Sequence, residues 1–182
     1  MIHRFARIAA VGAVLASVLV GCAAQPEPAA SPTVAFSNEE EAFAAAEATY
    51  RAYVDALNAV DLSDPETFED VYAWTTGDES AQAREDLTSL HAEGFEVGGQ
   101  TRVLSLQPST EQPDDFPLSL ILDVCLDVRG VTLLDNEGTS VVAPDRPDQQ
   151  SLRVPLARSN SSSSDFRIST VGGREGISEC AG

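Results

Sequence analysis

The stretch LSLILDVCLDV, residues 118–128, decides the fold, because apolar side chains occupy every second position along it. Successive side chains of a strand point to opposite faces, so the six apolar residues at even positions share one face. The opposite face carries Asp123, Cys125 and Asp127. This pattern predicts a strand that buries one face in a core and carries its polar residues on the other.

Further strand patterns surround this stretch. The segment Asp-Asn-Glu-Gly at residues 135–138 has turn chemistry, and Val141 with Val142 carries the chain back from it. A run of four serines predicts a loop at residues 160–165. The second half of the chain therefore predicts an antiparallel sheet, with strands at residues 102–107, 118–128, 131–134, 151–158 and 166–171.

The first half of the chain shows helical spacing instead. Ser37 and Glu40 have the spacing of a capping box, and apolar residues then recur every three or four positions. Pro65 marks the start of a short helix, because proline at a first helical position loses no hydrogen bond. Gly94 predicts the end of a third helix as a left-handed cap. Helices are thus expected at residues 37–59, from residue 64 to about 72, and at residues 78–93.

The acidic composition limits the partners of this protein. Its 182 residues carry 29 acidic and 11 basic side chains, which gives a net charge of −18. Arg4 and Arg7 lie in the first 21 residues, where there is no acid, so losing that segment would leave a net charge of −20. A surface this negative repels the phosphates of nucleic acids, so we expect no nucleic-acid partner.

The amino-terminal residues are typical of an export signal. Arg4 and Arg7 form a basic head, and residues 8–20 form an apolar run that is shorter than the roughly 20 residues needed to span a bilayer. Leu-Val-Gly-Cys at residues 19–22 follows and resembles the lipobox of bacterial lipoproteins. The resemblance implies that the Cys22 sulfur receives a diacylglyceryl group and that the chain is cut just before it.

This interpretation divides the chain into three parts. Residues 1–21 would be the signal peptide, residues 22–36 the lipidated cysteine with a tether rich in proline and alanine, and residues 37–182 a single α+β domain. The membrane would then be the first partner, reached through the lipid on the extracytoplasmic face. Ordinary secretion with cleavage near Ala23 or Ala24, and an uncleaved anchor, are the alternatives.

The three cysteines point to a disulfide. If Cys22 carries lipid, Cys125 and Cys180 form an even pair in an oxidising compartment. A bridge between them would close a loop of about 55 residues and stabilise the fold by about 4 kcal/mol on the chain-entropy estimate. The alternative is two free buried thiols.

The order of the expected elements resembles a known superfamily. Three helices followed by antiparallel strands resemble the NTF2-like (cystatin-like) cone, and the segment at residues 124–127, the Asp135 turn and the terminal Cys180 resemble actinobacterial lipoproteins. The resemblance implies a curved sheet that wraps the long helix and encloses a pocket. Some members of the superfamily are isomerases, dehydratases or hydrolases, and many only bind.

Two functions follow from these residues, and we expect the first. A non-catalytic module of the cell envelope would bind a small apolar ligand or an envelope protein. In the alternative, an NTF2-like pocket enzyme would use Asp123 or Asp127 as general base, with His91 as the partner acid. The other candidate pocket residues are Tyr50 and Trp74, whose rings could stack on a ligand.

Metal and cofactor chemistry find little support in the sequence. Once residues 1–21 are removed, His91 is the only histidine, and the carboxylates are dispersed or lie beside prolines in loops. Motifs for a nucleophile elbow, a phosphate loop or a zinc protease are absent from the sequence. We therefore expect no metal and no cofactor.

Replacing the lipidated residue tests the anchor. Cys22→Ser should abolish incorporation of labelled palmitate and release the protein from washed membranes, because the acyl chains would supply the membrane affinity. Cys180→Ser is the control, since it removes a different thiol and leaves the lipobox intact. A Cys22→Ser variant that still takes up palmitate would contradict the prediction.

Overall fold

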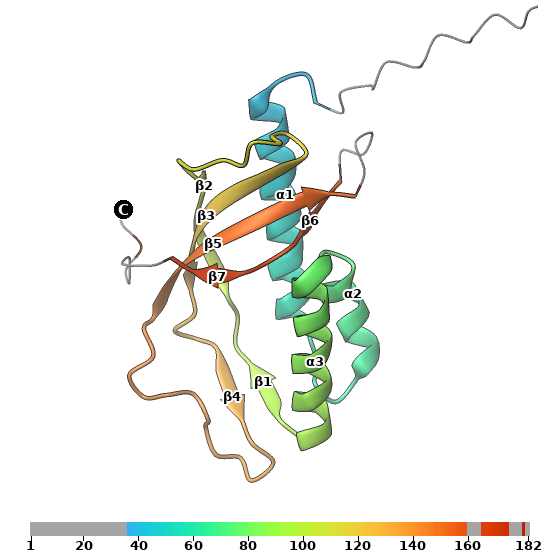
Figure 1. Cartoon of the computed structure of the whole chain (residues 1–182). Coiled ribbons are helices and arrows are strands. Elements are labelled where there is room, and N and C mark those ends of the chain that lie inside the picture. Colours follow the sequence, from blue (N-terminus) through green and yellow to red (C-terminus); the bar gives the residue numbers. More distant parts are fainter. Residues whose placement is uncertain (1–35, 160–164, 175–179, 181–182) are drawn as a thin grey trace, which may run out of the picture. The chain divides into compact units, whose positions relative to one another are not determined.

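The computed structural model describes residues 36–159, 165–174 and 180, and within them the chain is an α+β domain. Three α-helices come first and an open, antiparallel five-stranded sheet follows (Figure 1), which confirms the expected fold class. The signal at residues 1–21, Cys22, nearly all of the tether and most of the serine loop lie outside the described residues. In the described part of the chain, every helix is too short or too polar to cross a bilayer.

The helices lie where their spacing predicts. The long helix is followed by a single 3-10 turn, η1, at the expected proline, and Asp64 caps this turn by accepting a hydrogen bond from the Glu66 backbone N–H. Gly94 ends the third helix with a φ of 74°, as expected of a left-handed cap. The bounds are α1 Glu39–Asn58, η1 Pro65–Thr67, α2 Phe68–Tyr72 and α3 Gly77–Glu93.

The start of α1 differs by one residue from the prediction. Asn38, and not Ser37, is the N-cap, and its side chain accepts a 2.8 Å hydrogen bond from the Glu41 backbone N–H. The Glu41 carboxylate in turn accepts the Ser37 backbone N–H at 2.8 Å. Several acidic residues stand in a row here, so the spacing from Ser37 to Glu40 repeats one position later and sequence alone did not separate the two registers.

The sheet is antiparallel throughout, with order β2-β3-β5-β6 and β7 paired to β5. A separate two-stranded sheet pairs β1 with β4 in the register Val97–Leu133. The three-residue β1 is an element that the sequence did not predict. The bounds are β1 Glu96–Gly98, β2 Arg102–Pro108, β3 Ser119–Asp127, β4 Thr132–Leu134, β5 Gln149–Arg158, β6 Phe166–Ile168 and β7 Gly172–Gly173.

The core lies between α1 and one face of the five-stranded sheet (Figure 1). The even-numbered residues of β3 from Leu120 to Leu126 are buried, as their alternation predicts. Tyr50 of α1 and Phe166 of β6 are the largest fully buried side chains. At about 1.5–3 kcal/mol for each fully buried large apolar side chain, this layer supplies the main stabilisation of the fold.

The helical layer is joined to the sheet by backbone hydrogen bonds. Ile168 of β6 donates its N–H to the Trp74 carbonyl at 2.9 Å and accepts the Thr76 N–H at 2.8 Å. The segment between α2 and α3 thus forms a parallel bridge on the edge of the sheet. This bridge fixes where α3 begins relative to the sheet.

A sharp bend separates the small sheet from the large one. β1 runs into β2 and β3 runs into β4, yet the pairing is interrupted between them. At the interruption Gly99 has a φ of +79°, and a Cβ there would lie 1.8 Å from the carbonyl oxygen of Gly130. The close approach of the two backbones therefore requires glycine at position 99.

The bend is also attached to the end of α1. The Asn58 side chain donates to the Thr101 carbonyl at 2.9 Å and accepts the Thr101 N–H at 2.8 Å. This pair of hydrogen bonds satisfies both backbone groups of Thr101, which the ladder leaves unpaired at this point. The small β1–β4 sheet consequently lies beside α3 and does not extend the large sheet (Figure 1).

The requirement for Gly99 can be measured against a second glycine. Gly138 also has a positive φ, of 78°, but no atom lies within 4 Å of a Cβ built there. Gly138→Ala should lower the free energy of unfolding by about 1 kcal/mol, the cost of a left-handed alanine. Gly99→Ala should cost at least about 3 kcal/mol, because the overlap with Gly130 is added. Urea unfolding of the full chain, followed by the fluorescence of the single tryptophan, measures both, and equal losses would contradict this account of the bend.

Candidate functional site

A largely apolar hollow lies between the end of α1, α3 and the bent β1–β4 sheet. We call it the apolar groove, and its volume is about 250 Å³. One charged side chain, Arg146, is among its lining residues. The lining is Leu57, Val60, Leu62, Leu87, Leu90, Val97, Val131, Leu133, Val142 and Arg146.

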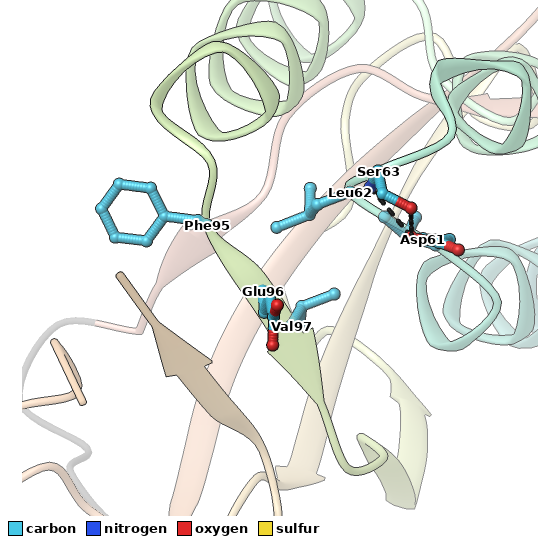
Figure 2. A pocket seen from close by; sticks show the side chains of 7 residues that line it. Asp61, Leu62, Ser63, Phe95, Glu96 and Val97 are labelled. Atoms are coloured by element: carbon cyan, nitrogen blue, oxygen red, sulfur yellow. Dashed lines mark hydrogen bonds between the residues drawn. The ribbon is translucent and has the colours of Figure 1, made fainter. Parts of the chain in front are cut away.

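Two further hollows share walls with the apolar groove. One has a volume of about 350 Å³ and adds Asp61, Ser63, Phe95 and Glu96 to the lining. Figure 2 shows Leu62, Phe95 and Val97 among the side chains around this hollow. The other hollow measures about 200 Å³ and reaches Gly99 at the bend. Val60 and Val97 line all three, so the hollows adjoin one another, and we call the three together the depression.

Apolar side chains in this region are left partly uncovered. α3 contains no fully buried residue, and Leu87 and Leu90, three positions apart on one face, are half-buried. Val97 remains 40% exposed and Val141, beside the groove residue Val142, 46% exposed. Contiguous exposed apolar surface on a strongly acidic protein is typical of a binding site.

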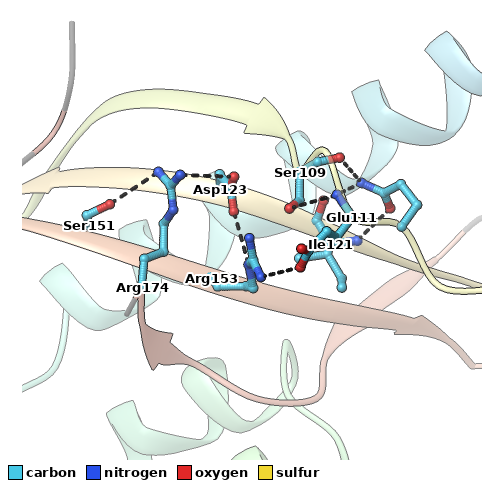
Figure 3. Close-up of polar contacts among 8 residues, drawn as sticks. Ser109, Glu111, Ile121, Asp123, Ser151, Arg153 and Arg174 are labelled. Carbon is cyan, nitrogen blue, oxygen red and sulfur yellow. Dashed lines mark hydrogen bonds and ion pairs between the residues drawn. The ribbon is translucent and has the colours of Figure 1, made fainter. Parts of the chain in front are cut away.

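Asp123 lies in an ion-pair network on the face of β3 opposite the core (Figure 3). Its two carboxylate oxygens each lie 3.4 Å from a guanidinium nitrogen, one of Arg153 and one of Arg174. Arg153 also pairs with Glu111 at 2.9 Å, and Arg174 hydrogen-bonds Ser151 through its backbone and its side chain. Two arginines that hold the carboxylate make Asp123 a structural anion, and it does not line the apolar groove.

Asp127 is also engaged, by Arg129. Its Oδ1 accepts the Arg129 backbone N–H at 3.1 Å and the Arg129 Nε–H at 3.0 Å. The backbone hydrogen bond is the main cause that lowers the pKa of Asp127 below its usual value, which makes it a weaker base. Four residues of strand separate it from Asp123, about 13 Å, so the two carboxylates do not form a close pair.

The remaining candidate pocket residues are not among the residues that line the apolar groove. His91, in the last turn of α3, places its Nδ1 2.7 Å from the Leu62 carbonyl, and its ring meets Phe68 edge-on. Tyr50 is 1% exposed within the core, where burial raises the pKa of its hydroxyl. Trp74 is half-buried, with Arg167 above its ring. The structure therefore does not assemble the five residues into one site.

Cys125 and Cys180 form a disulfide, with their Cα atoms 5.5 Å apart, which confirms the pairing expected from the cysteine count. Cys125 lies on the same face of β3 as Asp123 and is 5% exposed. The bridge thus attaches the end of the chain to the face of the sheet that carries the ion-pair network. Both cysteines are consumed by a structural role.

Sequence reasoning missed one half-buried acid, Glu79, in the first turn of α3. One carboxylate oxygen accepts the Val171 backbone N–H at 2.9 Å, and the other lies 3.4 Å from the Tyr53 hydroxyl. Burial is the main cause that raises the pKa of Glu79, although both hydrogen bonds oppose it. Thr76 and Glu79 have capping-box spacing, a signal that draws attention to Glu79 but not to its contact with Val171, 92 residues away.

The described residues contain no cluster of three or more His, Cys, Asp or Glu side chains able to hold a metal ion. The described carboxylates that approach other groups are paired with arginines, with backbone N–H donors or with side-chain hydroxyls and amides. The arrangement therefore offers an apolar surface for binding and no assembled set of catalytic groups.

Comparisons with known proteins add little to this geometry. No family model matches the chain, and no curated protein matches it. Among solved structures, a solution NMR structure of a de novo β-sheet design protein is similar at 17% identity, covering 79% of this chain and 95% of that one. Its TM-score is 0.31, too low to carry an argument about fold or function.

The raised pKa of Glu79 predicts a pH dependence of stability. Because folding favours the protonated carboxyl, the contribution of Glu79 to the free energy of unfolding should fall as the pH rises from its ordinary pKa of 4.5 towards the raised value. Glu79→Gln should remove this fall. The difference in unfolding free energy between the native chain and Glu79→Gln, measured in urea from pH 4 to 7, should therefore decrease with increasing pH.

Glu85→Gln is the control for charge in this experiment, because it removes a carboxylate from an exposed position of the same helix. A difference between the native chain and Glu79→Gln that grows with pH would have the wrong sign and would contradict the assignment of burial as the main cause.

Proposed function

We propose that this protein is a lipid-anchored lipoprotein on the extracytoplasmic face of the cell membrane, whose NTF2-like domain is a non-catalytic binding module. Its binding site is the apolar groove, and its ligand is a small apolar molecule or an apolar segment of an envelope protein. The anchor rests on the lipobox-like residues 19–22, and the disulfide supports an oxidising compartment.

One observation carries the binding function. Side chains from α1, α3, β1, β4 and the following loop meet around an open, nearly uncharged hollow, and several of them stay half-exposed. Leaving this much apolar surface in water costs roughly 25 cal/mol for each Å² that a ligand would cover, so covering it favours binding. Ligand sites are commonly hollows of this kind, apolar with a few polar groups at one side.

The contacts of the polar residues support binding without catalysis. Asp123 and Asp127 are bound to arginines, and neither lies in the apolar groove. A general base needs a free carboxylate within hydrogen-bond reach of the proton it removes. No described contact favours the enzyme alternative, and the general-base role of Asp123 or Asp127 stays a prediction.

A charge placed in the groove tests the binding function. Val97→Arg should abolish ligand binding, because Val97 lines all three hollows and a guanidinium there would have to be desolvated by an apolar ligand. Leu104→Arg is the matched control, since Leu104 is an equally exposed strand residue outside the lining, at 49% against 40% exposure. Native mass spectrometry of the full chain, prepared from its own envelope in nanodiscs, measures the retained mass.

The native chain and Leu104→Arg should carry an additional small-molecule or protein mass that Val97→Arg lacks. Retention of the same mass by Val97→Arg would place the binding site elsewhere. Absence of any additional mass from the native chain would contradict the binding function itself.

A further inference from the structure

The adjoining hollows differ in charge. The neighbouring hollow of about 350 Å³ includes Asp61 and Glu96 in its lining. In the apolar groove, Arg146 contributes the only charged side chain among the lining residues. In a chain with a net charge of −18, one arginine beside nine apolar residues is a local reversal of the surrounding charge.

Arg146 is held in place by one of its nitrogen atoms. Nη2 donates to the Val128 carbonyl at 2.7 Å and to the Val131 carbonyl at 3.0 Å, which closes the turn between β3 and β4. A guanidinium has five N–H donors, and Nη2 supplies two of them. For the three donors on Nε and Nη1, no partner occurs among the residues that the structure describes.

A purely structural role for Arg146 would explain its two carbonyl contacts. It would not explain why this arginine lines an otherwise apolar groove. The carbonyl contacts use one edge of the guanidinium and fix its position, so the remaining donors are held in place on a residue that lines the groove. An ordered guanidinium with free donors binds a carboxylate or a phosphate more readily than it binds an uncharged polar group.

The size of the groove limits the apolar part of the ligand. Its volume of about 250 Å³ is below the range of about 300–1,000 Å³ typical of sites for drug-sized molecules. The neighbouring hollow of about 350 Å³ shares Val60, Leu62 and Val97 with the groove and is not lined by Arg146. A small space lined by nine apolar side chains accommodates a short aliphatic chain better than a large fused ring system.

We propose that the apolar groove binds an anionic amphiphile, with its acidic group on the free donors of Arg146 and its aliphatic chain along Val97 and Val60. This inference rests on the proposed function, and it names the ligand class and its orientation. The acidic side chains that line the neighbouring hollow repel the anionic group, which favours its placement at Arg146.

Photo-crosslinking tests the ligand class. The probes are decanoic acid carrying an aliphatic diazirine, the corresponding alcohol and the corresponding amine, applied to the full chain in phosphatidylcholine nanodiscs. Peptide mass spectrometry then maps the adducts. The acid should label the groove segments at residues 131–134 and 142–146 about fivefold more than the alcohol, the preference expected of a half-exposed charge pair. The amine should label less than the alcohol.

Variants of Arg146 show whether this residue causes the preference. Arg146→Met keeps the aliphatic stem and should label equally with acid and alcohol, whereas Arg146→Lys keeps the charge and should retain the preference for the acid. Arg51→Met removes an exposed arginine of α1 outside the groove and should behave like the native chain. Labelling by the alcohol reports in each variant that the groove is intact. If the alcohol no longer labels Arg146→Met, the experiment uses Arg146→Gln in place of that variant, because an amide can still donate to the two carbonyls.

The outcomes separate this inference from the proposed function. Labelling of the groove without preference for the acid, or a preference that survives Arg146→Met, overturns the anionic ligand and leaves the binding module standing. Failure of all three probes to label the groove in the native chain overturns the proposed function as well.

Discussion

The contact between the backbones of Gly99 and Gly130 is the constraint on which the rest of the structure depends. It lets two segments, 31 positions apart in sequence, cross at a distance that any side chain at position 99 would forbid. The paired strands therefore bend, and the Asn58 amide fixes the bend to the last residue of α1 through both backbone groups of Thr101. Since β1 and β4 then lie beside α3, the apolar groove is a direct result of the bend.

Both faces of β3 are covered by contacts that stabilise the fold, and the candidate binding surface lies elsewhere. The core face is closed by α1, and the opposite face is closed by the Asp123 ion pairs and by the disulfide. The partly buried Asp123 carboxylate there is paired with Arg153 and Arg174, which offsets the cost of removing it from water. The apolar groove lies beyond the bend, where neither face of β3 contributes to its lining.

Local patterns predicted the elements, whereas the site depends on contacts that no local pattern contains. Alternation over residues 118–128, Pro65 at a helix start and Gly94 at a helix end each act within a few residues, and each prediction was confirmed. The three residues of β1 are too few for a period, and Gly99 reads as an ordinary turn glycine until Gly130 is placed against it. The sequence left Asp123 as a candidate base because it does not reveal the two arginines that pair with this carboxylate. Those arginines come from β5 and from residue 174, far along the chain.

A groove formed by a backbone bend has a consequence for binding. Its opening is set by two glycines and by the Asn58 and Arg146 contacts, all of which are made within the folded domain. The groove walls would then be ordered before a ligand binds, so the protein would lose little conformational entropy on binding and most of the loss would come from the ligand. An aliphatic chain is flexible and loses much conformational entropy when it is confined. A charged contact at one end fixes the position of that chain along the groove through a single interaction. A preformed groove with one anchored guanidinium is therefore better suited to a short amphiphile than to a long, uncharged chain.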